Sequence, residues 1–240
     1  MRSALSLSVT VLLAAAATAP LGADFTSAVN AAMTPYYAAL VASHRGDAES
    51  TQRHLVLLAA KWDLVAREAP PPALASDPQW PAAVGRVKAI IERSRGFVHV
   101  RNLDKAHLEL EGLRLVLREV RGRHNMLVLD DYVTDYHESV ERIAVRASMQ
   151  NEIVLADADF AEMTKDLDRA RLLWAIVERE AGAVASAPGW TDAARRITAA
   201  QAALEKPLAA KDAARVTETA GHLRDAYHAL LAVLARLPRT

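Results

Sequence analysis

The 240-residue chain contains no cysteine and only nine glycines, and both shortages exclude kinds of chemistry. Without a thiol there is no disulfide, thiolate metal site, iron–sulfur cluster, covalently attached haem or cysteine nucleophile. Nine glycines leave little material for phosphate-binding loops, and the sequence has no G-x-S-x-G turn, P-loop or His-Glu-x-x-His helix. A non-enzymatic role is therefore favoured over an enzyme.

The chain also lacks an excess of charge, since 29 basic side chains balance 29 acidic ones. A nucleic-acid-binding protein has a surplus of Lys and Arg, and a disordered chain is poor in apolar residues, whereas 52% of this chain is hydrophobic. We expect a folded protein with no nucleic-acid partner.

The neutral total hides local imbalance. Residues 86–101 and 114–123 are mainly basic, and residues 130–168 hold eleven carboxylates against three bases. An acidic surface of this kind attracts cations or a basic partner. The interpretation we favour is that basic and acidic helices face each other or are solvated, because mixed charge is ordinary on helix surfaces.

Long apolar runs are confined to the start of the chain. Arg2 precedes an uncharged apolar stretch from Ala4 to Ala17, and small residues follow up to Ala23, a pattern typical of a secretory signal peptide. The stretch is shorter than the roughly 20 residues that span a membrane. We expect residues 1–23 to be removed and a soluble chain starting at Asp24 to reach the periplasm. No later segment has the composition of a membrane span.

Apolar residues after the signal recur at steps of three and four, which predicts helices throughout. Two such rows have the same spacing and carry Trp at the same place. The rows are Ala48, Thr51, Leu55, Leu58, Trp62, Val65 and Ala69, then Phe160, Met163, Leu167, Ala170, Trp174, Val177 and Ala181. Further along, Trp80 corresponds to Trp190 at an offset of 110.

Such spaced similarity indicates an internal repeat. We predict an all-α fold built by tandem duplication of a four-helix up-down unit, with about eight helices in total. Residues 24–122 form the first unit and residues 123–240 the second, as two bundles or one continuous helical body.

Several residues mark expected helix ends. Asp47, Asp104 and Asp212 stand where N-caps are expected, and Thr34-Pro35 has the form of a cap followed by a first-turn proline. Pro207 is expected to break a helix.

Histidine, methionine and carboxylates are the metal ligands left to an exported chain without cysteine. Side chains four residues apart share a helix face, which pairs a nitrogen with a carboxylate at three places. These pairs are His107/Glu111, His137/Glu141 and Glu218/His222.

Residues 123–141 hold the densest group of such ligands. We predict that a divalent transition metal, iron or copper, is bound there in a labile way. The predicted ligands are His137, Asp130 and Glu141, with His107 or His124. The same stripe also suits a solvated flank of a bundle helix.

The histidines do not repeat with the scaffold, since His107 corresponds to Thr217 and His137 to Tyr37. A metal site would thus belong to one unit or lie between units. One alternative is a scaffold or chaperone-like module that binds a periplasmic protein through helix surfaces.

A second alternative is an electron carrier that binds haem b between a methionine and a histidine. The available pairs are Met126 with His222 or His228, and Met33 with His107. Helix phase disfavours the first two, because it places His222 and His228 off the apolar face of the last helix.

Overall fold

The computed structural model describes residues 23–151 and 154–238. Over these ranges it contains helices and no strands, which confirms the all-α prediction with about eight helices. The expected signal peptide lies outside the described residues except for its final Ala23. Within the described ranges, no helix has the combination of length and apolar character that a membrane span needs.

The described helices follow one another through short connections. In order they are α1 (Ala23–His44), α2 (Ala48–Val65), α3 (Pro72–Ala75), α4 (Trp80–His99), α5 (Leu103–Arg123), α6 (Leu129–Ser148), the 3-10 turn η1 (Met149–Asn151), α7 (Asp157–Glu180), the 3-10 turn η2 (Gly182–Ser186), α8 (Trp190–Ala210) and α9 (Ala213–Leu234).

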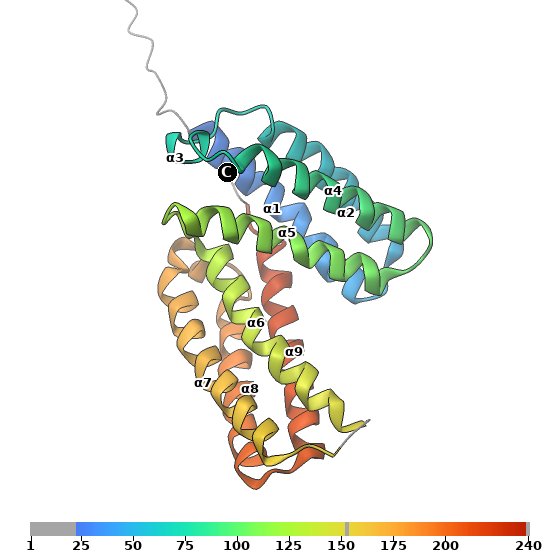
Figure 1. Cartoon of the computed structure of the whole chain (residues 1–240), viewed down its shortest axis with the longest axis vertical. Coiled ribbons are helices and arrows are strands. Elements are labelled where there is room, and N and C mark those ends of the chain that lie inside the picture. Colours follow the sequence, from blue (N-terminus) through green and yellow to red (C-terminus); the bar gives the residue numbers. More distant parts are fainter. Residues whose placement is uncertain (1–22, 152–153, 239–240) are drawn as a thin grey trace, which may run out of the picture.

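The long helices form two groups of four, which we call the first and second halves. Figure 1 shows α1, α2, α4 and α5 together at the top and α6 to α9 together below. The halves meet where α1 packs against α9 and α5 packs against α6. Buried apolar side chains from both halves belong to one hydrophobic cluster, so the core is continuous across the junction.

Residues paired by the repeat occupy matching places. Trp62 on α2 and Trp174 on α7 are both buried, and Trp80 and Trp190 are the buried first residues of α4 and α8. Both halves thus bury tryptophan at the positions that the repeat pairs, which agrees with the repeated spacing in the sequence.

Two of the three expected N-caps are confirmed. The Asp47 carboxylate accepts a hydrogen bond from the Ser50 N–H at 2.9 Å, and Asp212 caps α9 in the same way. The prediction for Asp104 is wrong, because the cap lies two residues earlier, at Asn102, which accepts from the Lys105 N–H at 3.1 Å.

Both proline expectations are also wrong. Pro35 lies inside α1, where the preceding Thr34 donates its hydroxyl to the Leu237 carbonyl at 3.2 Å instead of capping a helix. Pro207 lies inside α8, which continues to Ala210. In both places the helix continues across a residue that local rules treat as a boundary.

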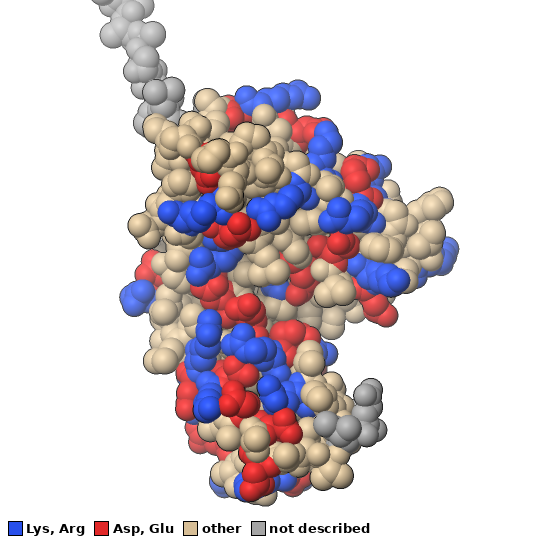
Figure 2. Space-filling model, viewed as in Figure 1, with Lys and Arg blue, Asp and Glu red and all other residues tan. Residues whose placement is uncertain are grey.

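The local charge imbalance is compensated within the molecule. Arg118 and Arg121 on α5 pair with Asp135 and Asp131 on α6, each at 2.8 Å. The basic end of the first half thus faces the acidic start of the second. Figure 2 shows Lys and Arg interspersed with Asp and Glu over the visible face of both halves.

Candidate functional site

Polar side chains from α1, α5, α6 and α9 gather where the two halves meet. On α5, three of them lie four and three residues apart, so they share one helix face. The two members on α6 lie four residues apart, and the three on α9 lie within four residues of one another. We call this group the junction cluster. It consists of His44, His107, Glu111, Arg114, His137, Glu141, Arg224, Tyr227 and His228.

Arg114 is a charged side chain at the centre of the cluster with only 5% of its surface exposed. Its guanidinium donates hydrogen bonds to the Tyr227 hydroxyl, to Glu111 Oε2 at 2.5 Å and to His137 Nδ1. Burial alone would lower the pKa of Arg114, but Tyr227, Glu111, Tyr36 and Tyr37 together outweigh it and raise the pKa, so the group stays charged. Arg114 therefore joins side chains of three helices.

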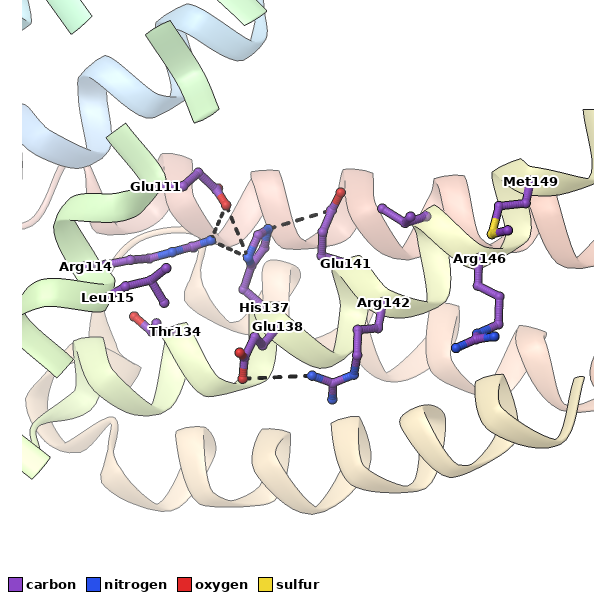
Figure 3. A pocket seen from close by; sticks show the side chains of 11 residues that line it. Glu111, Arg114, Leu115, Thr134, His137, Glu138, Glu141, Arg142, Arg146 and Met149 are labelled. Atoms are coloured by element: carbon purple, nitrogen blue, oxygen red, sulfur yellow. Dashed lines mark hydrogen bonds and ion pairs between the residues drawn. The ribbon is translucent and has the colours of Figure 1, made fainter. Parts of the chain in front are cut away.

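His137 accepts a hydrogen bond from Arg114 through the lone pair of Nδ1. Because a guanidinium only donates, Nδ1 of His137 is the unprotonated nitrogen and the proton of the neutral ring is on Nε2, which lies 3.9 Å from Glu141 Oε2. Burial, followed by the charge of Arg114, holds the pKa of His137 well below its usual range. Figure 3 shows the ring between Arg114, Glu111 and Glu141.

His107 has the opposite arrangement of its ring nitrogens. The Ser43 hydroxyl lies within hydrogen-bond distance of the Leu40 carbonyl, at 3.0 Å, and of His107 Nδ1, at 2.9 Å. We assign its single proton to the carbonyl, which makes Nδ1 the protonated nitrogen of His107 and the donor to Ser43 Oγ. The lone pair is then on Nε2, 3.6 Å from Glu111 Oε1. Burial, with smaller contributions from His44 and Arg114, lowers the pKa of His107 to about 4, so the ring is neutral at pH 7.

Glu111 Oε1 faces this lone pair. Within the described part of the chain this buried oxygen has no hydrogen-bond partner, whereas Oε2 is held by Arg114. With the proton of His107 assigned to Nδ1, two acceptor atoms face each other at 3.6 Å. Burial raises the pKa of Glu111, and Arg114 opposes that rise.

Two further imidazoles stack across the junction. His44 of α1 and His228 of α9 lie 3.4 Å apart between ring centroids at an angle of 14°, and His107 is 5.9 Å from each. The buried Nδ1 of His228 is without a partner among the described residues. Burial, followed by the influence of His44 and His107, lowers the pKa of His228 to about 3.

Two hollows border the cluster and share Glu111, His137 and Glu141 in their walls. The smaller, about 300 Å³, is also lined by the three remaining histidines and Arg224. The larger, about 630 Å³ and drawn in Figure 3, extends along α6 past Val145 to Met149. Volumes of this size are typical of small-ligand sites.

The structure divides the predicted ligand set among three places. His137, Glu141 and His107 lie in the junction cluster. Asp130 instead accepts a hydrogen bond from the Tyr37 hydroxyl at 2.8 Å, and His124 bonds Asp77 at 2.9 Å at the far end of α5. Among the described residues, no three His, Asp or Glu side chains already stand in a coordinating arrangement.

The three predicted pairs also differ in outcome. His107/Glu111 and His137/Glu141 each come within 4 Å. Glu218 pairs with Arg215 at 3.1 Å, and His222 is exposed.

The residues considered for haem do not share a site. Met33 is buried in the core, 2% exposed, and Met126 lines a small cavity beside Phe25 and Trp80. His228 lines the smaller hollow of the junction instead.

Sequence reasoning missed several members of the cluster. Helix phase places His228 off the apolar face of α9, and this displacement directs the ring toward α1. One sequence signal could have found two of them, since Arg114 and Arg224 correspond at the repeat offset of 110 and each pairs with a cluster glutamate, Glu111 and Glu141.

Comparison of the chain with protein-family models, curated proteins and solved structures found no match.

Proposed function

We propose that this chain is an exported, periplasmic binding protein without enzymatic activity, and that it holds a divalent transition-metal ion, iron or copper, loosely at the junction cluster. The export part of the proposal rests on the composition of residues 1–23. The absence of cysteine restricts the ligands to imidazole, thioether and carboxylate groups.

One observation carries the metal proposal: His107 Nε2 lies 3.6 Å from Glu111 Oε1, a buried oxygen with no hydrogen-bond partner among the described residues. Nitrogen and oxygen ligands lie about 2.1 Å from such ions, so these atoms, 3.6 Å apart, can share one ion at an angle of about 120°. Arg114 holds the other oxygen of Glu111 and so orients the carboxylate. Two protein donors, with water at the remaining positions, make a labile site.

In this proposal the predicted ligand His137 positions the site instead of binding the ion. Its Nδ1 is occupied by Arg114, and its Nε2 carries the proton. The ring thereby fixes Arg114, which in turn fixes Glu111.

The test is a titration of the purified chain 24–240 with Cu²⁺, and with Fe²⁺ under anaerobic conditions, followed by calorimetry. His107→Ala and Glu111→Gln should each weaken binding at least tenfold, since supporting residues alone are worth that much. His222→Ala, which removes an exposed histidine of α9, is the matched control and should bind as the unaltered chain does. Equal affinity in all four proteins would refute the proposal.

A second candidate function is binding of a protein partner, and one observation favours it. The outer face of α2 exposes three large apolar side chains, Val56, Leu57 and Leu64, by 48%, 53% and 45%. If the purified chain binds no metal and shows no haem absorption, protein binding remains as the candidate function. Val56→Asp, which places a charge on this apolar face, should then abolish capture of the partner.

A further inference from the structure

His228 offers a further nitrogen beside the two proposed metal ligands, His107 and Glu111. Its Nδ1 is buried without a partner in the described part of the chain, although a buried polar atom is costly unless it is satisfied. The atom belongs to a ring that lines the same hollow as His107 and Glu111.

We propose that His228 supplies a third protein donor, so that the ion, Cu²⁺ by preference, is held between the two halves of the molecule. This rests on the proposed metal-binding function and adds the identity of the third ligand and the class of ion.

Distances allow His107 and His228 to share an ion. An imidazole centroid lies about 3.2 Å from a metal bound at its nitrogen, so two rings on one ion have centroids at most about 6.4 Å apart. The centroids of His107 and His228 are 5.9 Å apart. The separation of α5 and α9 at this point is therefore compatible with one ion shared by the two rings.

His44 stands on the other side of His228 as a stacking partner. Its ring is too close to His228, at 3.4 Å between centroids, for both to bind one ion as they stand. His44 is also the exposed member of the three histidines and belongs to the last turn of α1. We assign it the role of supporting the ring of His228.

The donor set selects the class of ion. Two imidazoles and one carboxylate suit Cu²⁺ or Zn²⁺, whereas Mg²⁺ and Ca²⁺ prefer oxygen alone, and Cu²⁺ binds most tightly in the divalent series.

The position of the ligands couples binding to the junction. His107 and Glu111 come from α5 in the first half, and His228 comes from α9 in the second. An ion bound by all three links the halves, so loading should raise the melting temperature of the chain.

The experiment is electron paramagnetic resonance of chain 24–240 loaded with one equivalent of Cu²⁺, with His228→Phe as the variant because Phe keeps the ring on His44 without a nitrogen. The unaltered chain should show coupling to two imidazole nitrogens and His228→Phe to one, with at least tenfold weaker Cu²⁺ binding and a smaller rise in melting temperature. His44→Ala should keep both nitrogens, and circular dichroism should establish that each variant is folded.

The outcomes separate the two proposals. Failure of the unaltered chain to bind Cu²⁺ or Fe²⁺ overturns the proposed function and this inference together. Cu²⁺ bound with one nitrogen, or bound identically by His228→Phe, leaves the proposed function standing and overturns the third ligand. Loss of a nitrogen in His44→Ala but not in His228→Phe does the same.

Discussion

The stability of the junction should depend strongly on Arg114, because its charge is buried and is neutralised by an ion pair with Glu111. Arg114→Met removes the cation and leaves a buried carboxylate without its partner, a change that costs about 3 kcal/mol or more. Urea unfolding followed by circular dichroism measures this loss. Adding Glu111→Gln to the variant should restore part of the stability, since it removes the uncompensated charge.

The repeat supplies a matched control for this substitution. Arg224 occupies the equivalent position in the second half, but its ion pair with Glu141 is only partly buried, with side chains 38% and 39% exposed. Arg224→Met should therefore cost less than about 1 kcal/mol. Equal losses for the two variants would contradict the distinction between them.

Asp77 should make the stability of the protein depend on pH. The hydrogen bond with His124, followed by those from the Gln79 N–H and Arg123, holds the pKa of the Asp77 carboxyl well below its usual range. A carboxyl with a lowered folded pKa stabilises the fold above its unfolded pKa of about 3.9, and this contribution is lost as the pH falls toward the folded value.

Urea unfolding at pH 7 and pH 3 checks this expectation. Asp77→Asn should be less stable than the unaltered chain at pH 7 and should lose less stability on acidification, because an amide does not titrate. The exposed Asp168→Asn serves as a control and should follow the unaltered chain. A parallel loss in Asp77→Asn and the unaltered chain would count against the role of Asp77.

Among the helices, α5 offers a clean test of where an element begins. Asn102→Ala removes the hydrogen bond to the Lys105 N–H and should cost about 1 kcal/mol. Asp104→Ala, two residues later, leaves the cap in place and should cost less than half as much. The urea midpoints of the two variants measure these losses, and that of Asn102→Ala should be the lower. A lower midpoint for Asp104→Ala would indicate that Asp104 is the cap.

Elements were predictable from the sequence where a local pattern agrees with packing. The rows of apolar residues that contain Trp62 and Trp174 correctly predicted buried helix faces. Their steps of three and four residues arise because only one face of each helix is buried. Asp104, Pro35 and Pro207 show the limit of such rules. A cap or a proline acts over one helical turn, whereas the helix end is decided by all the contacts of the segment, including a hydroxyl of α1 that bonds a carbonyl near the other end of the chain.

At the scale of the whole molecule, the candidate site arises from the docking of one half on the other. Spacing along one helix predicted that His107 would meet Glu111 and that His137 would meet Glu141, since both pairs are four residues apart. No spacing relates α1 to α9, so the stacking of His44 on His228 was not readable. The assignment of Asp130 and His124 to the same cluster could be judged only once the chain directions were known.

The packing of α1 against α9 also has a kinetic consequence. Thr34 and Leu237, joined by a hydrogen bond, are 203 positions apart along the chain. Contacts between such distant segments form slowly, because a large loop must close before they contribute any stability. During synthesis, the apolar side of α1 that α9 covers stays bare until α9 has been made, and in that interval it is open to aggregation.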